Sequence, residues 1–207
     1  MILALSGKLF IKDNLLRDGR WNERTNHMGI GLINKTLGLI GFGGIGREFV
    51  KISKDLFKKV VCYDPFVSKK EMKNLEVDKV DFDEIANSSD FLVVLCDLNE
   101  KTNGMIDRTF LNKMKSSSYL INLSRGPVVN ENDLIASLRQ NKIAGAGLDV
   151  MTNEPIEENN ELLNFKNTIL TPHSLCWTDE CFHSIATEAI TSILNYFNNK
   201  KIINRVV

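Results

Sequence analysis

The sequence predicts an α/β fold, a doubly wound parallel sheet with helices on both faces. From Thr36 onward, short apolar runs alternate with segments whose apolar residues recur every three or four positions. This alternation of strand and helix favours parallel strands joined by right-handed crossovers. The runs at 91–95 and 119–123 are almost wholly apolar, as expected of strands that helices cover on both faces. A glycine-rich turn follows the strand that begins at Thr36, and it indicates a Rossmann-type sheet.

The residues before the sheet predict a helix and a loop. Apolar side chains at helical spacing, interrupted by Gly7, predict a helix over residues 1–18 that ends at Asp18-Gly19. The polar stretch over residues 20–31 predicts a connecting loop.

The remaining elements follow from the period of the apolar pattern. Strands are predicted at 36–41, 59–63, 91–95, 119–123, 144–149 and 168–170, with a weaker strand near 77–80. Helices are predicted at 44–56, 82–87, 107–114, 131–141 and 178–198. In the last helix, apolar residues from Phe182 to Leu194 recur at intervals of three and four, which predicts one buried face. Residues 202–207 are expected to form an extended tail.

Composition narrows the class of protein. The 207 residues are 43% hydrophobic, and 26 basic residues balance 26 acidic ones, which predicts a globular protein with no general attraction to nucleic acid or to an anionic membrane. No apolar run is long enough to span a bilayer, and residues 1–5 make a poor signal peptide. We therefore expect a cytoplasmic location.

The cysteines agree with that expectation. Cys62, Cys96, Cys176 and Cys181 lack the spacing of a disulfide framework and fit a reducing compartment. A metal site is a competing interpretation of the cluster that two of them form with His173 and His183. Its spacing matches no zinc pattern, so we expect no metal.

The spacing Gly41-x-Gly43-x-x-Gly46 predicts a phosphate-binding turn between a strand and a helix. Gly41 permits the turn, Gly43 lets the backbone approach a pyrophosphate, and Gly46 lets helix and strand pack closely. The first amides of the helix then face the anion, with the helix dipole behind them. The motif therefore predicts a dinucleotide cofactor.

Asp64 stands at the end of the next predicted strand, where a carboxylate accepts hydrogen bonds from the adenosine ribose. A carboxylate there would repel a 2′-phosphate, so the sequence favours NAD over NADP. The competing interpretation of Asp64-Pro65 is a simple turn after a strand.

Three polar residues, Arg125, Glu154 and His173, follow the ends of predicted strands, where doubly wound sheets bind their ligands. A guanidinium can bridge the carboxylate and the carbonyl of a 2-oxo acid. A histidine can deliver the proton that carbonyl reduction needs, and a carboxylate can orient it. Each residue has an alternative interpretation, since Arg125 could shield a loop, Glu154-Pro155 could open a turn, and His173 could be an ordinary loop histidine.

Three further motifs stand in order behind the glycine turn. They are Asn122-Leu-Ser-Arg-Gly-Pro-Val-Val, Gly147-Leu-Asp-Val-Met-Thr-Asn-Glu-Pro and Leu170-Thr-Pro-His. Together with the turn they closely resemble the D-2-hydroxyacid dehydrogenase family, which includes phosphoglycerate, glyoxylate/hydroxypyruvate and D-lactate dehydrogenases. The resemblance covers essentially the whole chain.

The resemblance implies an NAD-dependent oxidoreductase that acts on a D-2-hydroxy acid or its 2-oxo acid, as a homodimer built through the cofactor lobe. It implies that Arg125 binds substrate, that His173 is the acid/base and that Glu154 is the partner of His173. It further implies that Asp149 holds the nicotinamide amide and that the remaining cofactor contacts come from Gly44, Ile45, Cys96, Leu123 and Ser174. Glu154, where the formate dehydrogenase branch has an amide, argues against that branch.

Two departures from the family pattern stand out. Asp97 occupies a position that is usually proline. Family members also begin with a separate substrate lobe, whereas this chain starts at what resembles the helix between the lobes. We therefore expect NADH binding with poor turnover, and three parts in the chain: an interdomain helix and loop at 1–30, an NAD-binding domain at 31–177, and a helix and tail at 178–207 that return toward the substrate lobe.

Two alternatives remain open at this stage. The family also contains corepressors that resemble the enzymes at these residues, so a noncatalytic protein that senses NAD(H) is one. A nonfunctional gene fragment is the other.

Overall fold

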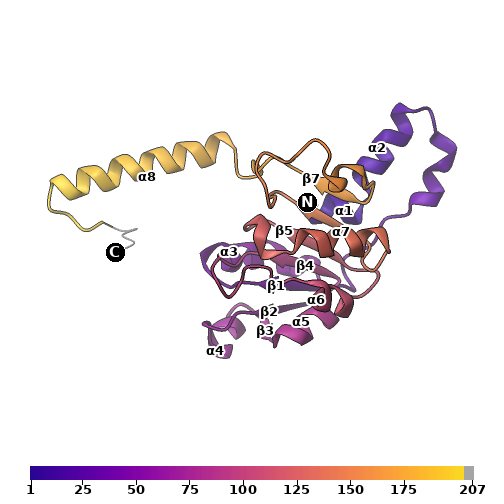
Figure 1. Cartoon of the computed structure of the whole chain (residues 1–207). Helices are drawn as coiled ribbons and strands as arrows, with labels where there is room; N and C mark the ends of the chain where they lie inside the picture. Colours follow the sequence, from indigo (N-terminus) through magenta and orange to yellow (C-terminus); the bar gives the residue numbers. More distant parts are fainter. Residues whose placement is uncertain (203–207) are drawn as a thin grey trace. The chain divides into compact units, whose positions relative to one another are not determined.

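The computed structural model describes residues 1–202, and within them seven strands form one parallel sheet (Figure 1). The order across the sheet is β3-β2-β1-β4-β5-β6-β7. The strands are β1 (Thr36–Ile40), β2 (Lys59–Tyr63), β3 (Val77–Lys79), β4 (Phe91–Val94), β5 (Tyr119–Asn122), β6 (Gly145–Leu148) and β7 (Thr168–Leu170). The order reverses between β1 and β4, which defines a doubly wound, Rossmann-type sheet. The predicted fold class is confirmed.

Helices connect the strands. They are α1 (Ile2–Ser6), α2 (Leu9–Arg17), α3 (Gly44–Ser53), α4 (Lys69–Lys73), α5 (Phe82–Ser88), α6 (Arg108–Lys113), α7 (Glu131–Arg139) and α8 (Asp179–Phe197). Short 3₁₀ turns are η1 (Trp21–His27), η2 (Lys54–Leu56), η3 (Gly126–Val128) and η4 (Glu161–Asn164). The chain divides into two compact units, one from Met1 to Pro172 and one that begins at His173.

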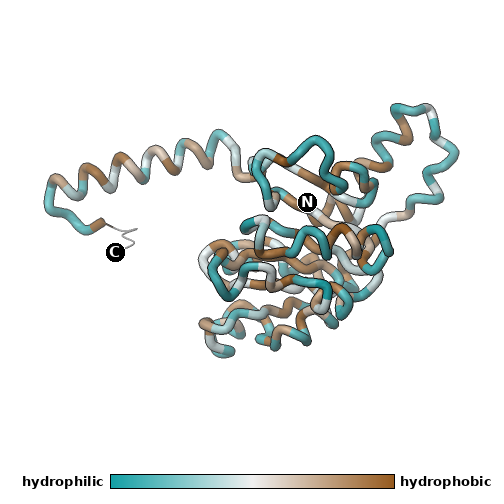
Figure 2. The backbone as a smooth tube through the Cα atoms, in the orientation of Figure 1, coloured by the Kyte–Doolittle hydropathy of each residue, from teal (hydrophilic) through white to brown (hydrophobic). Residues whose placement is uncertain are grey.

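The sheet buries a different core on each face, because successive side chains of a strand point in opposite directions. In β4, Phe91 and Val93 join the core that includes residues of α3 and α4, whereas Leu92 and Val94 join the core that includes residues of α5, α6 and α7. Figure 2 shows hydrophobic residues concentrated along the central strands. The two cores hold the strand ends in register, so that Ile40 pairs with Tyr63 on one side and with Val94 on the other.

The sequence predicts one helix over residues 1–18, and this prediction is wrong. The structure has α1 and α2, separated at Gly7 and at Lys8, whose φ is 52°. The carbonyl of Ser6 accepts a hydrogen bond from the amide of Ile30 over 2.8 Å, so it does not continue the helical pattern. The predicted end is confirmed, since Asp18 caps α2 and Gly19 has a φ of 69°.

The unit that contains α8 does not supply the buried face predicted for this last helix. Within the described residues, α8 has no buried side chain, and Phe182, Ile185 and Ile190 are 54%, 59% and 58% exposed. Hydrophobic and hydrophilic residues alternate along it in Figure 2. The periodicity shows which face suits a covering element, but it does not supply that element. The predicted tail lies outside the described residues from 203 onward.

Smaller differences concern short elements and element ends. The helix α4 is not among the predicted elements, and the loop predicted at 20–31 contains η1. The helix predicted to reach residue 56 gives way to η2 after Ser53. None of the helices within residues 1–202 combines the length and the apolar composition needed to cross a membrane.

Candidate functional site

The glycine turn lies between β1 and α3, at the point where the strand order reverses. Gly41 has a φ of 101°, which side chains rarely permit. A Cβ atom there would lie 2.7 Å from the amide nitrogen of Cys96 and 2.8 Å from the carbonyl carbon of Leu95. Only glycine therefore lets this turn pack against the chain that follows β4.

The start of α3 has the features of an anion-binding helix end. In the described chain, its N-cap Gly43 makes no side-chain capping hydrogen bond, and the first turn carries no acidic residue. A Cβ atom added to Gly43 or Gly44 would meet no described atom within 4 Å, so there is open space beside both. A Cβ on Gly46 would lie 2.6 Å from the carbonyl oxygen of Gly41, which makes the helix and the turn pack closely. These features fit a pyrophosphate at the amides of Gly44 and Ile45.

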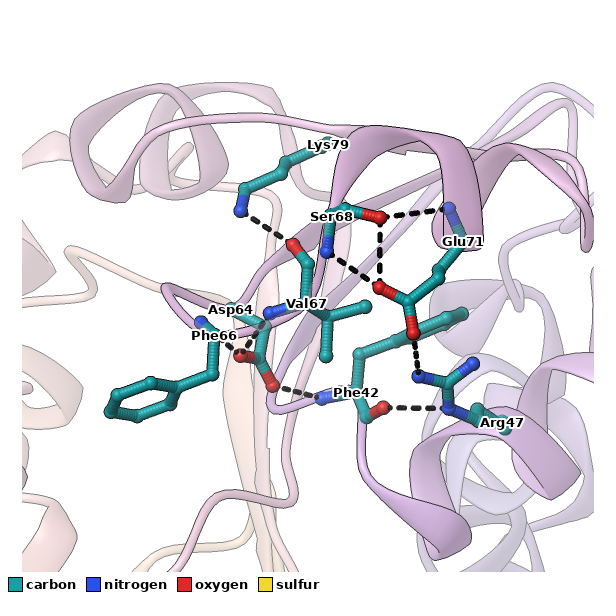
Figure 3. Close-up of polar contacts among 8 residues, drawn as sticks. All are labelled: Phe42, Arg47, Asp64, Phe66, Val67, Ser68, Glu71 and Lys79. Carbon is teal, nitrogen blue, oxygen red and sulfur yellow. Dashed lines mark hydrogen bonds and ion pairs between the residues drawn. The ribbon is translucent and has the colours of Figure 1, made fainter.

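The Asp64 carboxylate joins the glycine turn to the loop that follows β2 (Figure 3). Its Oδ2 accepts a hydrogen bond from the amide of Phe42 over 2.8 Å. Its Oδ1 accepts from the amides of Phe66 and Val67, over 2.8 and 3.2 Å. A carboxylate has about four acceptor positions, so these three bonds leave Oδ2 able to accept from one ribose hydroxyl. The residues present therefore fit a dinucleotide.

The same edge of the sheet continues through the other predicted cofactor residues. Cys96 follows β4, and burial raises the pKa of its thiol to about 11. Leu123 follows β5, and its amide donates to the carbonyl of Val94 over 3.3 Å. Asp149 follows β6 and is buried. The hydroxyl of Thr171 donates to Asp149 Oδ1 over 2.6 Å. The structure brings these residues onto neighbouring strand ends.

Arg125 lies in the loop after β5, directly before η3, and the buried side chain of Asn122 shapes that loop. Asn122 Nδ2 donates to the carbonyl of Arg125 over 2.9 Å. Asn122 Oδ1 accepts from both the amide and the hydroxyl of Ser124, each over 3.1 Å. The guanidinium of Arg125 donates to the carbonyl of Ser124 over 2.7 Å. One buried carboxamide thus fixes the main chain on both sides of the bond that joins Ser124 to Arg125.

The loop that carries Glu154 packs directly against the Arg125 loop. A Cβ on Gly126 would overlap the carbonyl oxygen of Met151, so glycine is needed for the two loops to touch. Glu154 Oε1 in turn accepts from the amide of Met151 over 3.0 Å. The structure therefore brings Arg125 and Glu154 onto adjoining loops.

His173 and Ser174 belong to the second unit. His173 has a φ of 52°, a left-handed conformation that histidine adopts more readily than most residues. The carbonyl of Ser174 accepts from the amide of Trp177 over 2.9 Å. These residues form the turn that leads to Thr178, whose hydroxyl caps α8 by accepting from the amide of Cys181 over 3.1 Å.

Comparison with known proteins agrees with this geometry. A family model described as "D-isomer specific 2-hydroxyacid dehydrogenase, NAD binding domain" matches residues 1–174. The chain belongs to this family. The matched residues correspond to the NAD-binding domain of the family, as the sequence motifs suggest.

Individual members of the family are similar over most of the chain. A D-3-phosphoglycerate dehydrogenase of Archaeoglobus fulgidus is 35% identical over 206 residues, which are 100% of this chain and 39% of the relative. A glyoxylate reductase of Thermococcus litoralis is 35% identical over 192 residues, which are 90% of this chain and 58% of the relative. The solved structure of an acyclic imino acid reductase in complex with NADPH and D-Arg has a TM-score of 0.87 at 28% identity, over 98% of this chain and 64% of that one. The chain thus spans between about two fifths and two thirds of the length of these proteins.

The contacts of several residues in this NAD-binding domain could not be predicted from the sequence. Asn122 opens a recognised motif, but the sequence does not reveal which atoms it binds. Arg47 and Lys79 lie outside every motif, and both contact the neighbourhood of Asp64 (Figure 3). A usable signal does exist for Ser68 and Glu71, because their spacing is that of a capping box.

Proposed function

We propose that this chain is the cofactor-binding part of an NAD-dependent oxidoreductase that interconverts a D-2-hydroxy acid and its 2-oxo acid. The observation that carries the proposal is the hydrogen bond between Phe42 in the glycine turn and Asp64, at the reversal point of the sheet. Arg125 and Glu154 stand on two touching loops at the same edge. Two similar proteins, a D-3-phosphoglycerate dehydrogenase and a glyoxylate reductase, support the substrate class.

The proposed reaction is R–CHOH–COO⁻ + NAD⁺ → R–CO–COO⁻ + NADH + H⁺, and its reverse. Bound NAD would exchange a hydride with C2 of the acid. The guanidinium of Arg125 would hold the substrate carboxylate and the C2 oxygen through its planar fork. His173 would take the hydroxyl proton during oxidation and return it during reduction, and Glu154 would orient His173.

Asp64 is the residue that we propose selects NAD over NADP. The fold does not make that choice by itself, since the imino acid reductase of similar fold is bound to NADPH. The Asp64 carboxylate has its remaining acceptor position beside the glycine turn, where a ribose hydroxyl can donate and a 2′-phosphate would be repelled. We expect NADPH to bind at least about tenfold more weakly than NADH.

Two measurements test the proposed function. Calorimetric titration of the chain with NADH should show saturable binding, and no binding to folded protein would contradict the proposal. Oxidation of NADH should then be followed with glyoxylate, hydroxypyruvate, pyruvate and phosphohydroxypyruvate. Turnover with one of them would identify the substrate class and would exclude a noncatalytic sensing protein.

We also propose a cytoplasmic homodimer that forms through the cofactor domain. Apolar side chains on α1 and α2 support the dimer, since Leu3, Leu9 and Leu16 are 66%, 58% and 62% exposed. The cysteines support a reducing compartment, because all four are free thiols in the described chain. Light scattering should give twice the chain mass, and Leu9→Glu with Leu16→Glu should give the monomer mass. A monomer at every concentration of the unaltered chain would contradict the dimer.

A further inference from the structure

Phe42, in the middle of the glycine turn, is held at both of its main-chain polar atoms (Figure 3). Its amide donates to Asp64, and its carbonyl accepts from Nε of Arg47 over 3.1 Å. The guanidinium carbon of Arg47 also lies 5.1 Å from the centroid of the Phe42 ring, within the range of a cation–π contact. Because Phe42 lies between Gly41 and Gly43, these contacts fix the part of the chain that would face the pyrophosphate.

Arg47 reaches a second segment through Glu71. Its Nη2 lies 3.3 Å from Glu71 Oε1. Glu71 Oε2 accepts from the amide and the hydroxyl of Ser68, over 3.0 and 2.8 Å, and the Ser68 hydroxyl accepts from the amide of Glu71 over 3.2 Å. The hydrogen bonds from Ser68, and then the Arg47 guanidinium, hold the pKa of Glu71 below its usual value. Glu71 is therefore charged at neutral pH.

The loop between Asp64 and Ser68 completes a closed path of contacts. Asp64 accepts from the amides of Phe66 and Val67, and the carbonyl of Val67 accepts from Lys79 over 2.6 Å. We call the closed path Phe42–Asp64–Ser68–Glu71–Arg47–Phe42 the turn–loop network. It joins the glycine turn to the loop after β2 twice, once through the Asp64 carboxylate and once through the Arg47–Glu71 pair.

We propose that Arg47 and Glu71 are positioning residues for the dinucleotide, which set the distance between the glycine turn and the Asp64 carboxylate. The inference rests on the proposed function and extends it to residues outside the binding motif. Without Arg47, the carbonyl of Phe42 loses this donor, and of the two links described above only the one through the Asp64 carboxylate remains. Asp64 must then hold the turn and receive the ribose without that support.

Stability and cofactor binding should respond differently to the loss of this pair. The side chains of Arg47 and Glu71 are 34% and 51% exposed, and exposed ion pairs contribute little to folding. The pair Arg139–Glu161 offers a matched control, because it has the same residue types, with side chains 59% and 55% exposed. It joins α7 to η4, and within residues 1–202 neither of its side chains bonds to a residue of the turn–loop network.

The experiment compares Arg47→Ala, Glu71→Ala, the double variant and Arg139→Ala in the full chain. Calorimetry gives the Kd for NADH and for ADP-ribose, which lacks the nicotinamide, and urea titration gives stability. We expect Arg47→Ala to weaken both ligands about tenfold, the scale of one lost charge-assisted hydrogen bond. Glu71→Ala should act similarly, and the double variant should be no weaker than Arg47→Ala, because the two residues act through one path. Arg139→Ala should leave both Kd values unchanged.

Each other outcome overturns the inference. If the unaltered chain binds NADH and Arg47→Ala binds it equally well, the inference fails and the proposed function stands. If the two single losses add in the double variant, Arg47 and Glu71 do not act as one path. If the unaltered chain binds neither ligand, the proposed function fails and takes the inference with it. Should Arg47→Ala not fold, Glu71→Gln decides, since a carboxamide still accepts from Ser68, and an unchanged Kd for it overturns the inference.

Discussion

The side-chain amide of Asn122 donates a hydrogen bond to the main-chain carbonyl of Arg125 over 2.9 Å. Asn122 is 1% exposed and ends β5, so a buried residue of the sheet holds the loop that presents the proposed substrate-binding arginine. The main-chain carbonyl of Asn122 also accepts from the amide of Asp149 over 3.1 Å. One residue thus connects the Arg125 loop to the strand end that carries Asp149.

Asn122→Ala should therefore loosen the Arg125 loop. Loss of the carboxamide leaves the Ser124 amide without its partner and removes one donor from the Arg125 carbonyl, which still accepts from the amide of Val128 over 3.2 Å. This should lower the free energy of unfolding by about 1 to 3 kcal/mol. Amide hydrogen exchange at Ser124 should accelerate, and the KM for a 2-oxo acid should rise more than the Kd for NADH. Asn167→Ala is the control, since Asn167 Nδ2 donates to the carbonyl of Ala144 over 3.0 Å at the opposite edge of the sheet. Equal effects of the two variants on KM would contradict a special role for Asn122.

Gly126→Ala should separate the loops that carry Arg125 and Glu154. The added Cβ would overlap the carbonyl oxygen of Met151, and overpacking of this kind typically costs about 1 to 3 kcal/mol. Urea unfolding should show the loss, while NADH binding at the glycine turn should largely remain. Gly31→Ala serves as the control, because its Cβ would meet no described atom within 4 Å. A Gly126→Ala protein as stable as Gly31→Ala would show that the loops do not need this contact.

Two glycines of the turn should separate folding from cofactor binding. Gly41→Ala places a Cβ 2.7 Å from the Cys96 amide at a φ of 101°, so we expect a loss of stability of about 1 to 3 kcal/mol or more. Gly43→Ala has an ordinary φ of −71° and open space around its Cβ, so its stability should change by less than about 1 kcal/mol. Its NADH affinity should nevertheless fall by about tenfold, because the Cβ enters the space that we assign to the pyrophosphate. Unchanged NADH affinity in a folded Gly43→Ala protein would place the cofactor elsewhere.

His173→Asn is a sharper test of the acid/base than an alanine exchange. Asparagine tolerates the left-handed φ of 52° at this position, so the backbone is preserved while the titratable ring is removed. In a form of the protein with measurable turnover, kcat should fall by about 10²- to 10⁴-fold, with little change in NADH affinity. His183→Asn, on α8, is the matched control and should retain activity. Comparable turnover in both variants would exclude His173 as the acid/base.

The thiols should differ in their reaction with iodoacetamide. Burial raises the pKa of Cys62 to about 12 and that of Cys96 to about 11, whereas Cys176 is exposed. Since the thiolate is the reactive form, Cys96 should be labelled at pH 8 about a hundredfold more slowly than an ordinary exposed thiol. Mass spectrometry should find Cys176 labelled first, and equal labelling of all four cysteines in urea serves as the control. Labelling of Cys96 as fast as Cys176 in the folded chain would contradict its burial.

The same pKa shifts predict how stability depends on pH. Both thiols keep their protons in the folded state at pH values where the unfolded chain begins to lose them, so the folded state is disfavoured as pH rises. The contribution is fully present below the ordinary thiol pKa and is lost between about pH 9 and pH 11 to 12. Replacing Cys62 by Ala should flatten this decline in the urea midpoint.

Local sequence was sufficient for the sheet and for the cofactor motif. The strands at Lys59–Tyr63 and Thr168–Leu170 match their predicted bounds, because an apolar run between polar turns marks where an extended segment begins and ends. Gly41 and Asp64 could be identified because a fixed number of residues separates them and their roles depend on backbone conformation and charge. The family also follows from motifs that are contiguous in the chain.

Tertiary structure alone decided the contacts between distant segments. The amide of Ile30 reaches the carbonyl of Ser6 and ends α1, although the apolar spacing continues beyond it. Arg47 pairs with Glu71, and Gly126 packs against Met151. Both contacts form because crossovers of different length bring distant segments to one edge of the sheet. Hydrophobic periodicity records which side of a segment avoids water. It carries no information about which other segment provides the covering surface. The donors that surround Asp64 and the lack of buried side chains on α8 are therefore seen only in the tertiary structure.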